Sequence, residues 1–224
     1  MANKQSEFIN RVKLTMPEAM DYSVSLSTPK EYDKFVKRIE KIVRSSLEYK
    51  DYIQYLKENV GLDKCVFFQN VTNKGNTRGR VSIEMHHEPF TLYDITCVVI
   101  NKYVKDGLPI NDLFIADEII ALHYENKVGL VPLSKTAHQL VHNSDKLVVP
   151  LNLCYGSYSE FLSEYDKYID DDMGLYDKLE HKIEVSEKLT PDDFQAIMKE
   201  FTYLDIEGVD EIEKLKLKEV KELA

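Results

Sequence analysis

Four of the six histidines of this chain fall into two short groups. His86 and His87 are adjacent at the end of VSIEMHH, whose alternation of apolar and polar residues predicts a β-strand. His138 and His142 are four residues apart in KTAHQLVHN, which predicts a short helix. Neighbours on a strand point to opposite faces, whereas residues four apart on a helix share a face. The spacing therefore allows several imidazoles to reach one metal ion while another imidazole points elsewhere.

This set of residue types suits the hydrolysis of a phosphodiester. Imidazoles hold a divalent cation, which neutralises charge on the phosphate and stabilises the leaving oxygen. A further imidazole can take the proton of the attacking water, because its pKa lies near neutrality. A zinc peptidase helix would need Glu between its two histidines as the base, and the chain has Gln139 there, which excludes that class.

The segments EMHHEPF and KVGLVPLSKTAHQLVHN resemble the HNH (ββα-metal, His-Me finger) nuclease family, in particular the colicin-type branch with its paired histidines. The resemblance implies that His86, His138 and His142 bind the metal and that His87 is the catalytic base. It implies a divalent metal cofactor (Zn, Mg, Mn or Ni, which the sequence does not distinguish), DNA as substrate, and an origin in bacteriophages or mobile elements.

The chain departs from the family pattern after the paired histidines. Gly129 stands where family members usually have an Asn that helps to hold the loop bearing the base, and Asn126 could supply that side chain by another loop path. Pro89 follows His87 by two positions, where three is usual. Glu84 is a candidate to orient an imidazole, as is Glu88 on the other side of the histidine pair.

Cations near the predicted centre are candidates for nucleic-acid contact. Lys74, Arg78 and Arg80 lie in TNKGNTRGR, between the apolar run KCVFFQNV and the strand VSIEMHH, and Lys135 begins the predicted histidine helix. We expect the two flanking segments to pair as a β-hairpin with a basic tip. An ordinary solvated turn is an equally good interpretation. His123 and His181 are interpreted as structural and exposed, respectively.

The remaining elements predict a mostly helical α+β chain around a small ββα-metal finger. Apolar spacing predicts one long or two consecutive helices from about 27 to 61, and two helices within 91–125 that form an insertion inside the finger. The predicted regions are an N-terminal helical region (1–64), an HNH-like core (65–156) and an acidic helical C-terminal region (157–224).

Composition limits the class of protein and the location that the sequence allows. With 43% hydrophobic and 30% charged residues, the chain should bury a substantial core. Three scattered cysteines, no signal peptide and no long apolar run predict a cytoplasmic protein (host cytoplasm, for a phage-encoded one) without a membrane span. The net charge of −10 resides in the C-terminal region, and the rest is near neutral, so bulk charge does not exclude DNA binding.

Two alternatives to an active nuclease stay open. One is a degenerate HNH fold that keeps zinc and only binds. The other is an acidic interaction protein that modulates a host or partner protein through its C-terminal region, with incidental histidines. The acidic region could also cover the basic tip or simply be a solvated subdomain. The sequence does not indicate the oligomeric state.

Overall fold

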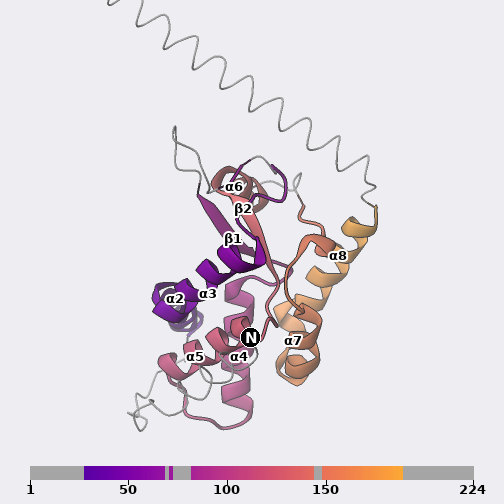
Figure 1. Ribbon diagram of the computed structural model, residues 1–224. Helices are drawn as coiled ribbons and strands as arrows, with labels where there is room; N and C mark the ends of the chain where they lie inside the picture. Colours follow the sequence, from indigo (N-terminus) through magenta and orange to yellow (C-terminus); the bar gives the residue numbers. More distant parts are fainter. Residues whose placement is uncertain (1–27, 69–70, 73–81, 144–147, 189–224) are drawn as a thin grey trace, which may run out of the picture.

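The computed structural model describes residues 28–68, 71–72, 82–143 and 148–188 (Figure 1). The elements run in the order α2 (Pro29–Ser45), α3 (Leu47–Tyr55), a π-helical turn (Leu56–Val60), β1 (Ile83–His87), α4 (Leu92–Lys105), α5 (Asp112–Tyr124), β2 (Leu130–Ser134), α6 (Lys135–Asn143), α7 (Tyr158–Tyr165) and α8 (Leu175–Lys188). Short 3₁₀ turns at Leu151–Leu153, Asp166–Tyr168 and Asp171–Met173 connect the later helices.

The N-terminal helical segment is two consecutive helices. The hydroxyl of Thr28 accepts from the Glu31 amide at the start of α2, and Ser46 ends α2 and caps α3 by accepting from the Tyr49 amide. The helical turns end at Gly61, whose positive φ of 92° suits a residue without a side chain. The predicted helical region and its end are confirmed.

The sheet has two antiparallel strands in the part of the chain that the structure describes. β1 pairs with β2 in a register that sets His86 opposite Val131 and His87 opposite Leu130. The predicted pairing of segment 81–87 with segment 64–71 is therefore wrong. Segment 64–68 instead contacts β2, where the Val66 amide donates to the Pro132 carbonyl. Every residue of β2 is buried, and β2 contacts both β1 and segment 64–68.

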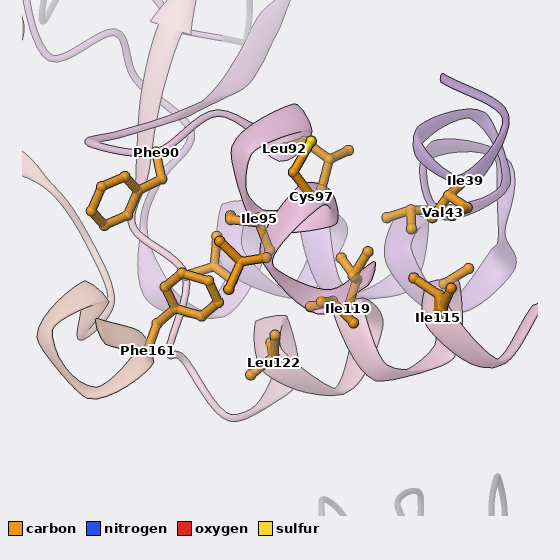
Figure 2. Packing of buried hydrophobic residues seen from close by; sticks show 14 of the residues in the cluster. Ile39, Val43, Phe90, Leu92, Ile95, Cys97, Ile115, Ile119, Leu122 and Phe161 are labelled. Atoms are coloured by element: carbon orange, nitrogen blue, oxygen red, sulfur yellow. The ribbon is translucent and has the colours of Figure 1, made fainter. Parts of the chain in front are cut away.

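The two helices predicted as an insertion do lie between the paired strands. A capping box of Thr91 and Asp94 starts α4, and the Asn111 side chain caps α5. These helices pack against α2, and apolar side chains from all three meet in the main core (Figure 2). The insertion thus supplies a large part of the main core.

A second, smaller cluster packs between the sheet and α6. Its buried members are Cys65, Phe67, Ile83, Val131, Leu133, Ala137 and Val149. Because α6 follows β2 directly and contacts both strands, its histidines are brought over the sheet. The described fold is mostly helical with one small antiparallel sheet, as the predicted α+β class requires.

The main core draws on all three predicted regions. Phe35 from α2, Phe90 from the segment after β1 and Phe161 from α7 belong to one buried cluster. Within the described residues, no helix combines the length and the apolar character needed to cross a membrane. The three-region division stays a prediction.

Candidate metal centre

Three of the four predicted histidines converge at the junction of β1 and α6. One ring nitrogen from each of His86, His138 and His142 lies within 4.8 Å of the others. The ring centroid of His86 is 5.1 Å from that of His138 and 5.0 Å from that of His142. The spacing of four residues does place both α6 histidines on one face, and β1 supplies the third ring.

The nitrogen separations suit a small divalent cation. Nε2 of His138 is 3.1 Å from Nε2 of His142. Two imidazole ligands of a tetrahedral zinc ion, each about 2.0–2.1 Å from the metal, stand about 3.3 Å apart. The two rings therefore lie nearly where a shared ion would hold them.

Glu84 fixes the orientation of His138. Its Oε2 lies 2.6 Å from Nδ1 of His138. Since Glu84 and His86 are two apart on β1, they share a face of the strand, and both contact the α6 histidines. With Nδ1–H donating to the carboxylate, Nε2 of His138 keeps its lone pair toward His142, as a carboxylate–histidine–metal arrangement requires.

Glu88 orients the His86 ring in the same way. Its Oε2 lies 3.2 Å from Nε2 of His86, which leaves Nδ1 of that ring as the free nitrogen. The Glu88 side chain is only 3% exposed. Burial raises the pKa of Glu88, but the hydrogen bond from His86 and the charge of Lys182 outweigh it and hold that pKa below its ordinary value. Glu88 is thus an ionised, buried acceptor.

The centre opens to solvent on its α6 side. His86 is buried, His138 is half-buried and His142 is exposed. Burial, the neighbouring His138 and then the charge of Arg44 lower the pKa of His142, which favours the neutral ring that binds metal. Three protein ligands with an open side are typical of catalytic zinc sites, whereas structural sites are closed by four.

His87 points into the core, away from this cluster. Its Nε2 lies 3.0 Å from Nε2 of His123, and Nδ1 of His123 lies 2.7 Å from the Ile119 carbonyl. The His123 Nδ1–H therefore donates to Ile119, and its Nε2 accepts from His87. Tyr49 and Tyr52 pack edge-on against the His123 ring.

Both rings of this second pair are held neutral. Burial and then the neighbouring His123 lower the pKa of His87 well below its ordinary value. Burial lowers the pKa of His123 to about 4, against the opposing effect of its bond to Ile119. The sequence interpretation of His123 as structural agrees with this burial, but its pairing with His87 was not foreseen. The two histidines are far apart in the sequence, and only the packing of α5 against β1 brings them together.

The loop after His87 is held by backbone contacts at Gly129. The Glu88 amide donates to the Gly129 carbonyl at 3.0 Å. A Cβ at position 129 would lie 1.9 Å from the Glu88 carbonyl oxygen, which is far too close. The close approach of the two backbones explains why position 129 is a glycine.

Asn126 holds a different part of the molecule. It adopts a positive φ of 56°, and its side-chain oxygen accepts from the hydroxyls of Tyr52 and Tyr155. Its carbonyl accepts from the Ser157 amide. Asn126 therefore ties the turn after α5 to the segment before α7, and its described contacts do not include the loop of His87.

Of the four residues predicted to contact nucleic acid, one lies among the described residues. Lys74, Arg78 and Arg80 lie outside the described residues, and Lys135 is exposed at the start of α6. A surface hollow of about 520 Å³ between α2 and α3 adds cations that the sequence analysis did not single out: it is lined by Lys37, Glu40, Lys41, Arg44, Ser45 and Lys50. The recurrence of cations every three or four residues along α2 was the available signal.

The fold and the site define a mostly helical protein with a candidate three-histidine metal centre between a two-stranded sheet and a helix. A family model described as bacteriophage G278-like virion protein matches residues 2–219, so the chain belongs to that family. The predicted bacteriophage origin is thereby confirmed. Comparison with curated proteins gives no match, and comparison with solved structures gives none either.

Proposed function

We propose that this phage virion-family protein is a metal-dependent endonuclease of the HNH type that hydrolyses phosphodiester bonds in DNA. The observation that carries the proposal is the convergence of His86, His138 and His142 within 4.8 Å. His86 lies on β1, and the other two lie on α6, which directly follows β2; a ββα-metal finger has this order of strands and helix, here with α4 and α5 between the strands.

Each residue of the centre has a defined task in this proposal. The three imidazoles hold the cation, while the carboxylates of Glu84 and Glu88 orient two of the rings and select their ligating nitrogens. When bound, a divalent cation supplies Lewis-acid stabilisation of charge on the phosphate and the leaving oxygen. The exposed side at His142 leaves room for the phosphate to approach.

His87 is proposed as the base that takes the proton from water. Its low pKa keeps the ring neutral, as a base must be. In the described conformation Nε2 of His87 is bonded to His123, so this role requires the ring to leave that partner and turn toward the metal centre.

Basic side chains support DNA as the substrate. Lys41, Arg44 and Lys50 line the hollow beside α2, and the charge of Arg44 acts on the pKa of His142. Cations near a metal centre attract the phosphate backbone and position it without reading sequence. The acidic balance of the whole chain resides elsewhere, mainly from residue 157 onward.

Metal binding and DNA cleavage test the proposal together. Wild-type protein is titrated with Zn²⁺ by calorimetry and then incubated with supercoiled plasmid in Mg²⁺, Mn²⁺, Ni²⁺ or Zn²⁺. We expect one ion per chain and conversion of the plasmid to nicked or linear forms. His138→Ala should lose both properties, whereas His181→Ala, which alters an exposed histidine of α8, should keep both.

A second candidate function is a zinc-stabilised binding protein without nuclease activity. The burial of His87 against His123 favours it, because this pairing holds the His87 ring in the core instead of beside the three converging histidines. Bound zinc with no cleavage in any of the four metals would establish this alternative and refute the nuclease. If the nuclease is correct, His87→Ala should bind metal and fail to cleave.

A further inference from the structure

Lys182 of helix α8 contacts a carboxylate beside the candidate metal centre. Nζ of Lys182 lies 2.7 Å from Oε1 of Glu88, and the two side chains are 19% and 3% exposed. This oxygen has no well-aligned hydrogen bond among the described residues, so Lys182 compensates it as an ion pair. The other oxygen of the same carboxylate contacts His86. One buried carboxylate thus links α8 to a predicted metal ligand.

Two further contacts hold α8 against the body. Lys178 pairs with Asp94 at the start of α4, and the Ser186 hydroxyl accepts from the Leu151 amide at 3.1 Å. Lys178, Lys182 and Ser186 follow at intervals of four and therefore share one face of α8. The face that docks on the body is the one that carries the lysine to Glu88.

We propose that Lys182 is a positioning residue of the metal centre, which fixes Glu88 so that Glu88 in turn fixes His86. The proposal rests on the proposed metal centre but does not depend on nuclease activity. It gives part of the acidic C-terminal region a defined task, namely to complete the surroundings of the metal ligands.

The physical reason lies in the burial of the carboxylate. An exposed ion pair contributes little to the order of its members, because water competes for both charges. A buried carboxylate without a partner is costly, and it rotates or admits water to find one. Without Lys182, Glu88 would lose the contact that sets its orientation, and the His86 ring would lose its fixed acceptor. Such outer partners commonly change metal affinity about 10- to 100-fold.

The test compares two lysines of the same helix face. Lys182→Met, Lys182→Arg and Lys178→Met are prepared in the full chain, and Zn²⁺ affinity is measured by competition with a chelator. Lys178→Met is the matched control, because it removes an anchor of α8 that does not touch Glu88. We expect a loss of about 10-fold for Lys182→Met, the lower end of the range for residues that contact a metal ligand directly, because Lys182 acts through Glu88. Lys182→Arg should restore most of the affinity, and Lys178→Met should change it little.

Two further measurements separate positioning from folding. The absorption spectrum of bound Co²⁺, taken on variants with wild-type circular dichroism, should shift in Lys182→Met and stay unchanged in Lys178→Met. Adding Lys182→Met to Glu88→Gln should weaken Zn²⁺ binding no further, because the lysine acts through that carboxylate. If Lys182→Met does not fold, the proposal is judged on Lys182→Gln by the same criteria.

The outcomes distinguish this proposal from the nuclease. Zinc affinity in Lys182→Met or Lys182→Gln equal to or above that of wild type would overturn the positioning role, as would an equal loss in Lys178→Met. A wild-type protein that binds Zn²⁺ but cleaves no DNA would refute the nuclease and leave this role intact. A wild-type protein that binds no Zn²⁺ would refute the metal centre and this role with it.

Discussion

The buried pair of His87 and His123 should make the metal-free fold sensitive to acid. In the folded chain burial lowers the pKa of His123 to about 4, whereas in the unfolded chain it returns to about 6.5. The unfolded state therefore binds more protons between these values. The stabilisation is fully present above pH 6.5 and is lost as the pH falls toward 4. Between pH 7 and pH 4.5, His123 alone should cost about 2 kcal/mol of unfolding free energy.

Urea denaturation at the two pH values, followed by circular dichroism with a chelator present, measures this loss. His87 acts in the same direction, because its pKa is also lowered, so the wild-type loss should be at least the stated amount. His123→Gln removes the titrating group and keeps an acceptor for His87, and it should lose about 2 kcal/mol less than wild type over the same interval. His181→Gln, at an exposed site, should behave as wild type. Equal losses in wild type and His123→Gln would refute this account.

Three further predictions concern backbone packing, helix capping and DNA contact. Gly129→Ala should destabilise the fold by about 2–3 kcal/mol in urea denaturation, because its Cβ would overlap the Glu88 carbonyl; wild-type stability would contradict the close approach. Asn111→Ala should cost about 1 kcal/mol in thermal unfolding, since the α5 amides lose their cap, and an unchanged melting temperature would count against that cap. Lys41→Gln combined with Lys50→Gln should weaken DNA binding and reduce the salt slope by roughly two in fluorescence anisotropy; an unchanged slope would exclude the hollow as a phosphate contact.

The helices and the histidine spacing could be predicted because their signals are local. Apolar residues of α2 recur at helical intervals, and Thr91 and Asn111 are cap residues directly before apolar runs. His138 and His142 need only four residues of helix to share a face. Each of these inferences depends on a few neighbouring residues, so no knowledge of the tertiary fold was needed.

The pairing of the strands could not be predicted from neighbouring residues. The segment before the basic turn was expected to pair with 81–87, because adjacent segments often form hairpins. β1 instead pairs with β2, across the whole of the α4–α5 insertion. The choice depends on which strand buries more apolar surface in the finished core, and a local pattern of hydrophobic residues does not contain that information.

The candidate metal ligands could be predicted from the sequence, but the sequence did not show which carboxylate orients which imidazole. Glu84 and Glu88 were equal candidates beside the histidine pair, and the structure gives each a different ring. Lys182 carried no signal, since it is one lysine among many in an acidic helical region. Its contact with Glu88 exists only because α8 docks on the body, and residues 88 and 182 are far apart in the sequence.

The alternation of β1 separates the candidate metal ligands from the proposed base. Glu84 and His86 lie on the face toward α6, so the candidate metal centre does not include His87. His87 lies on the other face and is bonded to His123 in the core. Metal affinity therefore depends on one face of the strand and the proposed proton transfer on the other. A protein with this arrangement could therefore bind an ion without cleaving DNA, so metal content alone would not establish the proposed nuclease.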